Sequence, residues 1–226
     1  MRAATATHRN PYREWIGAQI RADAWGYAAP GDLVSATRMA WEDATLSHVG
    51  NGVYGELWAA ALVSVAFTSE DPAAALRAAA RVVPPRSRLA VALDEVTTAH
   101  AAGGPWAAWR DAVDERPWGA YSWVHTVNNA CLVAAALLWG GGDFTRSISL
   151  AVQGGWDTDC NGATVGSILG ALGGRDAIAA HWTAPLRDEV RSALFGFERS
   201  SISDLAARTA SVARRALDAG GRPWEA

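Results

Sequence analysis

The stretch GELWAAALVSVAF, residues 55–67, is apolar on most faces and rich in alanine and leucine. This composition favours a buried α-helix over a strand, because both residues are strong helix formers and no polar face is left for solvent. A second stretch, ACLVAAALLW at residues 130–139, has the same character. Two buried helices need other helices to cover them, so the sequence predicts an all-α fold.

Start and stop signals extend this prediction along the chain. The segment at 71–83 opens with Asp71 and Pro72, which are typical of an N-cap and a first helical residue. The segment at 203–221 begins with serine and ends in arginines and glycines, as a terminal helix does. The stretches VVPPRS, AAGGPW and DERPWGAYSW predict loops. No stretch alternates convincingly enough for a strand, so we expect an orthogonal helical bundle of about ten helices.

Length and composition limit the class of protein further. The 226 residues suffice for one core, and we take residues 1–226 as a single domain. With 20 basic and 23 acidic residues the net charge is −3, so a nucleic-acid partner is not expected. No apolar run is long enough for a membrane span, and the N-terminus lacks the apolar segment of a signal peptide. The two cysteines, Cys131 and Cys160, make no disulfide framework, which predicts a reduced, cytoplasmic protein.

Two aspartates one residue apart stand out in GGWDTDCNGATVGSILGALGG, residues 154–174. In an extended backbone, Asp157 and Asp159 point the same way and can share a hard cation such as Mg²⁺. Gly154 and Gly155 permit a tight turn before them. The competing interpretation is a helix N-cap, since Asp satisfies free N–H groups and opposes the helix dipole. From spacing alone, the cap is favoured.

The residues behind this pair predict a closely packed helix. Gly162, Gly166, Gly170 and Gly174 recur every four positions and would form one bare stripe. Such a stripe lets another helix approach closely. A helix packed in this way would hold the preceding turn rigidly, as a ligand site requires.

Taken together, these segments resemble the ADP-ribosylglycohydrolase family. The stretch GGWDTDCNGATVGSILGAL is similar to that family's C-terminal metal motif, and DFTRSISLAVQ (143–153) to the helix that leads into it. WIGAQIRADAWGYA (15–28) and ATLSHVGNGVYGELWAAAL (44–62) resemble its central helices. YSWVHTVNNACLVAAALLWG (121–140) is similar to a segment of one branch of the family. The resemblance covers roughly residues 10–200.

The resemblance implies an all-α fold and hydrolysis of the glycosidic bond at the anomeric carbon of ADP-ribose. It also implies two Mg²⁺ ions at the base of a cleft, which can polarise hydroxyls and activate water. Asp157 and Asp159 match the family's two C-terminal metal-binding aspartates. Cys160 stands at the next metal position, where the family usually has threonine, and a thiol is a poor Mg²⁺ ligand.

The chain contains no Thr-Asp-Asp, the step that supplies the remaining metal ligands in the family. We therefore expect an N-terminally truncated version of the domain, which holds one Mg²⁺ or none. A fragment, a misplaced start codon, a half of a split protein with a complementing N-terminal chain, and a degenerate homologue all remain open. The leading hypothesis is a Mg²⁺-dependent hydrolase of ADP-ribose-containing small molecules or ADP-ribosylated proteins. The alternative is a non-catalytic homologue that binds an ADP-ribose-like ligand or a partner chain, and a third is another small-molecule hydrolase on the same fold.

Several loop residues are candidates for substrate binding. His48 is either a ligand contact or a buried or capping histidine. Asn51 could meet a phosphate or ribose, although turn chemistry explains it equally well. Trp123, His125 and Asn128 could line a nucleotide pocket, but a hydrogen-bonded pair that ties two helices together is slightly favoured for the last two. Gly155 and Trp156 complete the set, and for any single tryptophan of the twelve in the chain, packing is the favoured role.

Overall fold

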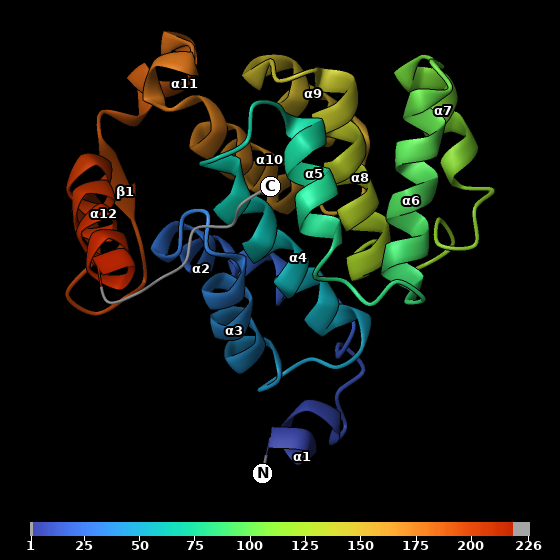
Figure 1. Cartoon of the computed structure of the whole chain (residues 1–226), viewed down its shortest axis with the longest axis horizontal. Coiled ribbons are helices and arrows are strands. Elements are labelled where there is room, and N and C mark those ends of the chain that lie inside the picture. Colours follow the sequence, from blue (N-terminus) through green and yellow to red (C-terminus); the bar gives the residue numbers. More distant parts are fainter. Residues whose placement is uncertain (1, 219–226) are drawn as a thin grey trace.

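The computed structural model describes residues 2–218, and within that range the chain forms twelve α-helices and one two-stranded sheet (Figure 1). The all-α prediction is confirmed. The helices are α1 (Arg2–Thr7), α2 (Asp23–Ala28), α3 (Leu33–Ala44), α4 (Asn51–Ala66), α5 (Pro72–Ala80), α6 (Arg88–Ala101), α7 (Trp106–Val113), α8 (Thr126–Gly140), α9 (Phe144–Gln153), α10 (Thr158–Gly173), α11 (Ala180–Thr183) and α12 (Ile202–Asp218). Three 3₁₀ turns join them, at η1 (Gln19–Arg21), η2 (Arg175–Ala177) and η3 (Ala184–Leu186).

The core is built around α4 and α8, the two helices that the apolar stretches predict. Every residue of α8 is buried, and so is every residue of α4 except Tyr54. Helices α2, α3 and α5 pack around α4, while α6 and α9 pack against α8. Helix α10 contacts both central helices. The continuous apolar character of the two stretches follows from this position, because neighbours cover them on all sides.

The predicted helix starts are confirmed by their capping contacts. Asp71 accepts a hydrogen bond from the backbone N–H of Ala74 at 2.7 Å, and Pro72 is the first residue of α5. Asp143 accepts one from the N–H of Arg146 at 2.6 Å at the start of α9. The terminal helix is observed as α12, and residues 219–221 of the predicted segment lie outside the described residues.

The sheet is a feature that the sequence pattern missed. Strands β1 (Glu189–Arg191) and β2 (Arg199–Ser201) pair antiparallel, with Val190 opposite Ser200. Each strand has three residues and no buried face, so no period-two alternation exists for the sequence to display. The expectation that the chain has no strand is therefore wrong at this hairpin.

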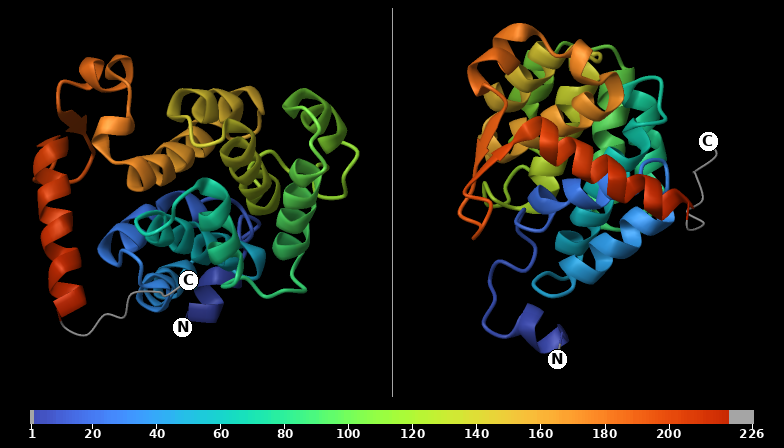
Figure 2. Two further views of the ribbon diagram at one scale, coloured as in Figure 1. Left: turned by 45° about the horizontal axis from the view of Figure 1, so that its top comes forward. Right: turned by 90° about the vertical axis from the view of Figure 1, so that its left-hand side faces the viewer.

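The hairpin leads into α12, which lies at one side of the bundle and packs against α2 (Figure 2). The segment 15–28, which resembles a central helix of the family, contains the short η1 and α2 rather than one long helix. The segment 44–62 contains the last residue of α3, a loop and most of α4. None of the helices described between residues 2 and 218 has the length and apolarity needed to cross a membrane.

The glycine stripe of α10 behaves only partly as predicted. A Cβ on Gly162 or Gly166 would face side chains of α9, at 3.5 Å from Val152 and 3.6 Å from Ile148. Helix α9 therefore packs on this face as expected, but these are ordinary van der Waals distances, so an added methyl group would also fit there. The last member, Gly174, follows the helix and has a positive φ of 69°.

Candidate metal centre

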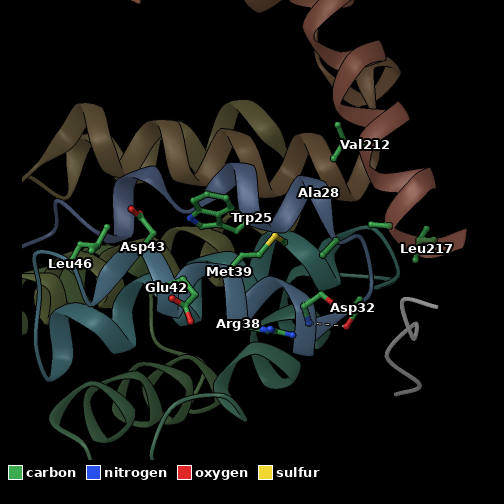
Figure 3. Close-up of a pocket in the computed structure, with 13 residues that line it drawn as sticks. Trp25, Ala28, Asp32, Arg38, Met39, Glu42, Asp43, Leu46, Val212 and Leu217 are labelled. Carbon is green, nitrogen blue, oxygen red and sulfur yellow. Dashed lines mark hydrogen bonds between the residues drawn. The ribbon is translucent and has the colours of Figure 1, made fainter. Parts of the chain in front are cut away.

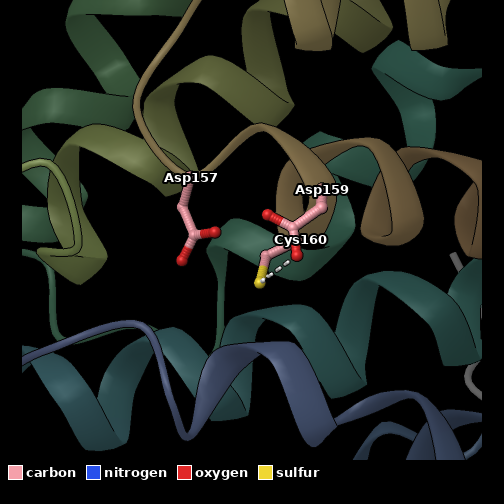
Figure 4. A group of neighbouring side chains, drawn as sticks. All are labelled: Asp157, Asp159 and Cys160. Atoms are coloured by element: carbon pink, nitrogen blue, oxygen red, sulfur yellow. Dashed lines mark hydrogen bonds between the residues drawn. The ribbon is translucent and has the colours of Figure 1, made fainter.

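The two aspartates lie at the start of α10, where the chain turns out of the loop after α9. Asp157 occupies the N-cap position, and Asp159 lies in the first turn of the helix. One ligand atom each from Asp157, Asp159 and Cys160 can be chosen so that all three lie within 4.8 Å of one another. Figure 4 shows the three side chains leaving the start of α10 on the same side. The residues that the sequence predicts as metal ligands are therefore neighbours in space.

Asp157 occupies the N-cap position, and the backbone of Cys160 in the first turn favours the charged form of its side chain. This carboxylate makes no capping hydrogen bond of standard geometry to an N–H of the first turn. Its side chain is largely buried, at 9% exposure. Burial raises the pKa of Asp157, and the neighbouring Asp159 carboxylate raises it further, while the thiol and backbone of Cys160 oppose the shift. A carboxylate that is buried, crowded by a second carboxylate and without a capping hydrogen bond of standard geometry fits a cation site.

The fit of the third predicted ligand is poor. Burial raises the pKa of the Cys160 thiol to about 12, and the two aspartates beside it add to the effect. In the metal-free chain the thiol is protonated, and its Sγ lies 4.0 Å from an Asp159 carboxylate oxygen, to which it donates a weak hydrogen bond (Figure 4). A neutral thiol is unsuited to Mg²⁺, which takes oxygen ligands. Asn161, in the same first part of α10, has a buried Oδ1 that lacks a hydrogen-bond partner within the described structure.

Asn129 of α8 connects the carboxylate turn to the loop that precedes α8. Its Oδ1 accepts hydrogen bonds from the backbone N–H of Asp157 at 3.2 Å and from the Asn161 amide at 2.7 Å. Its Nδ2 donates to the carbonyls of Trp123 and His125, both at 2.9 Å. The residue is fully buried, so these bonds are made without competition from water. The sequence pattern predicted a role for the neighbouring Asn128 but not for Asn129. The local signal for Asn129 was its place in a pair of polar residues directly before the apolar stretch 130–139.

The other predicted residues of this loop have separate roles. His125 is the N-cap of α8, and its Nδ1 accepts a hydrogen bond from the backbone N–H of Val127 at 3.1 Å. Asn128 is fully buried and donates to the Ser122 carbonyl at 3.1 Å. These are local contacts that secure the loop and the start of α8, rather than the expected bond between the two side chains. Trp123 is 61% exposed and lies on the loop surface.

His48 lies on the loop between α3 and α4, and Asn51 is the first residue of α4. His48 is buried, its Nδ1 lies 2.8 Å from the Ser47 hydroxyl, and burial lowers its pKa. Both ends of the Asn51 amide bind protein groups: the amide donates to Glu14 at 2.8 Å, and its oxygen accepts from the Leu89 N–H at 3.1 Å. Asn51 therefore ties α4 to α6 and to the N-terminal segment.

That N-terminal segment brings the two predicted loops together. The backbone of Arg13 accepts a hydrogen bond from Val49 at 2.9 Å, and the backbone of Glu14 accepts one from Thr126 at 3.1 Å. Trp15 forms an isolated bridge with His125. The loops that carry His48 and His125 are thus joined through residues 13–15, and Asn129 joins the second loop to the carboxylates.

A pocket of about 620 Å³ lies elsewhere, between α2, α3 and α12 (Figure 3). Its walls are mainly apolar, with Trp25, Met39 and Val212 among them, and acidic groups such as Asp43 lie at its edge. None of the predicted site residues lines it. It therefore plays no part in the candidate metal centre.

The fold and the site define the class of protein: an all-α bundle with a candidate cation site, formed by paired carboxylates at the start of α10. The family model of ADP-ribosylglycohydrolase matches residues 2–219, nearly the whole chain. The chain belongs to the ADP-ribosylglycohydrolase family, which acts on ADP-ribosylated substrates. No curated protein and no solved structure matches it.

Proposed function

We propose that the chain takes part in Mg²⁺-dependent hydrolysis of the glycosidic bond in an ADP-ribose conjugate, with Asp157 and Asp159 as cation ligands. The observation that carries the proposal is the Asp157 side chain, which is buried next to a second carboxylate and makes no capping hydrogen bond of standard geometry. Family membership supports a hydrolase and gives its substrate class, ADP-ribose conjugates. Cys160 is left out of the ligand set because sulfur is a poor ligand for Mg²⁺, which takes oxygen ligands.

The carboxylates of the chain supply negative charge, and residues of the loop before α8 can orient a bound substrate. The paired carboxylates place negative charge near the point where an oxocarbenium-like state would develop, which lowers its energy. Mg²⁺, when bound, polarises a substrate hydroxyl or lowers the pKa of a bound water. His125 uses Nδ1 as an acceptor, so in its neutral form Nε2 carries the proton and can donate to a ligand oxygen. Trp123 presents an exposed ring on which a planar base can stack.

The cation is tested first by binding, without any substrate. Calorimetric titration with Mg²⁺ and with Mn²⁺ should give one saturable site on the wild-type chain. Asp159→Asn should weaken binding by more than about tenfold, since it removes one of two ligand charges and tenfold corresponds to only about 1.4 kcal/mol. The matched control is Asp176→Asn, because Asp176 is an exposed aspartate in η2, outside the cluster. Equal affinities in the wild type and Asp159→Asn would contradict the ligand assignment.

The reaction is tested by release of ADP-ribose. Conjugates linked to arginine, to serine and to an acetyl group are incubated with the chain in Mg²⁺ or in EDTA, and the product is measured by chromatography. Release that needs Mg²⁺ and is lost in Asp159→Asn supports the proposal, whereas release that survives EDTA contradicts the metal dependence. Binding of ADP-ribose with no release from any conjugate favours the alternative of a non-catalytic homologue.

A further inference from the structure

The turn that delivers Asp157 has an unusual backbone. Gly155 has a φ of 86°, and Trp156, which carries a side chain, has a φ of 56°. A bulky residue rarely adopts this left-handed conformation, and it persists only where surrounding groups hold it. The groups that hold Trp156 therefore decide where the two carboxylates after it point.

One side chain from a distant helix holds both ends of this turn. Arg110 of α7 donates a hydrogen bond from Nε to the carbonyl of Gly154 at 2.6 Å. Its guanidinium carbon lies 5.1 Å from the centre of the Trp156 ring, a cation–π arrangement. A charged donor on a backbone carbonyl together with a stacked ring fixes the position of the carbonyl and of the indole.

Other contacts place the turn against the core without replacing Arg110. A Cβ on Gly154 would lie 2.2 Å from a Leu132 methyl group, so the turn is pressed against α8 at that point. Trp118 meets the Trp156 ring edge-on, with the ring centres 6.4 Å apart. Asn129 holds the N–H of Asp157, which lies beyond the strained residue. Among these groups, Arg110 is the one that binds both the carbonyl before the strained residue and the ring of that residue.

We propose that Arg110 is a positioning residue for the candidate metal centre: it holds the 154–156 turn so that Asp157 and Asp159 face one cation. The inference rests on the proposed function, because it takes the two carboxylates as cation ligands. Arg110 itself bears a positive charge and is not a ligand. Its removal would favour a nearby cation by charge alone, so any loss of cation affinity must come from the changed geometry.

The test compares Arg110→Met with Arg116→Met. Both variants keep the aliphatic stem and remove one positive charge. Arg116, however, pairs with Glu95 at 3.4 Å and makes no hydrogen bond or ion pair to the turn within the described part of the chain. Calorimetric titration with Mn²⁺ should show affinity about tenfold weaker in Arg110→Met and unchanged in Arg116→Met. In the metal-free proteins, amide hydrogen exchange measured by mass spectrometry should rise about tenfold in residues 154–161 of Arg110→Met and stay constant in α4 and α8.

The outcomes separate this inference from the proposed function. Wild-type affinity for Mn²⁺ in Arg110→Met would overturn the positioning role while leaving the ligand assignment intact. Faster exchange throughout the chain would also overturn it, because Arg110 would then support the fold in general. If the wild type binds no Mn²⁺, the proposed function fails, and hydrogen exchange alone decides the role of Arg110. Faster exchange confined to 154–161 then supports its hold on the turn, and unchanged exchange refutes it.

Discussion

Replacement of Asn129 by alanine tests the connection between α8 and the carboxylate turn. The wild-type amide accepts from the Asp157 N–H and the Asn161 amide, and donates to two loop carbonyls. Among residues 2–218, the Asp157 N–H and the Asn161 amide nitrogen have no other hydrogen-bond acceptor. Two buried donors thus lose their acceptor at once, and at roughly 1–3 kcal/mol for each we expect a loss of about 3 kcal/mol in the free energy of unfolding.

Asn128→Ala is the matched control, since Asn128 is equally buried and adjacent in sequence. Its removal leaves both of its backbone partners with another hydrogen bond. The Ser122 carbonyl still accepts from the His125 N–H, and the Asn129 N–H still donates to the His125 carbonyl. We expect a loss of about 1 kcal/mol for this variant. Urea unfolding of the metal-free proteins, followed by circular dichroism, gives both values. In thermal unfolding, the difference of about 2 kcal/mol corresponds to a Tm gap of roughly 4–8 °C for a chain of this size.

This reasoning is refuted if Asn129→Ala lowers the free energy of unfolding no more than Asn128→Ala does, because the buried amide would then contribute no more than a local contact. The comparison requires that the free energy of unfolding falls with urea concentration at the same slope in both variants. An equal loss would also remove the support for Asn129 as the link between the His125 loop and the carboxylates.

Two further predictions concern other buried positions. Burial, with the neighbouring Asp43, raises the pKa of Glu56 to about 9, so the folded chain keeps a proton that the unfolded chain releases above its ordinary pKa. This contribution to the free energy of unfolding is full in acid and is lost as the pH rises towards 9. The Tm of Glu56→Gln should therefore exceed that of the wild type most at pH 9 and least at pH 5. A Tm difference independent of pH would contradict the raised pKa of Glu56. Gly162→Ala should be neutral or stabilise the chain by up to about 1 kcal/mol, because a helical glycine is replaced where space exists. Gly140→Ala should destabilise it by about 1–3 kcal/mol, because the new Cβ would lie 1.9 Å from the Ser147 Oγ; urea unfolding that ranks the two variants in the opposite order would show that the packing of α9 is misjudged.

The sequence predicted those parts of the fold whose signals are local. The apolar runs at 55–67 and 130–139 identify α4 and α8 because helices buried on all sides need apolar residues on all sides. Asp71 marks a helix start because a cap bonds to an N–H only three residues away. The β1–β2 hairpin was missed for the converse reason: its strands are short and exposed, and carry no buried face to produce a pattern.

The candidate site divides in the same way. The proximity of Asp157 and Asp159 follows from their spacing, but spacing could not separate a cap from a ligand. The distinction depends on the direction of the Asp157 side chain, which makes no capping hydrogen bond of standard geometry in the structure. The role of the two aspartates as cation ligands stays a prediction. Asn51, as a loop residue, and Asn128, on a helix face with His125, were candidates for substrate contact, with a structural role as the alternative for each. The structure gives both amides protein partners.

By itself, the sequence determined an all-α chain with two buried central helices, its main helix starts and a pair of carboxylates at the start of α10. These depend on interactions between residues a few positions apart. Only the tertiary structure revealed that Asn129 and Arg110 hold the carboxylate turn, because their partners lie 28 and 44 positions away. Contacts over such separations are created by the packing of α7, α8 and α10 together. A single asparagine or arginine carries no local mark of the partner that packing will bring to it.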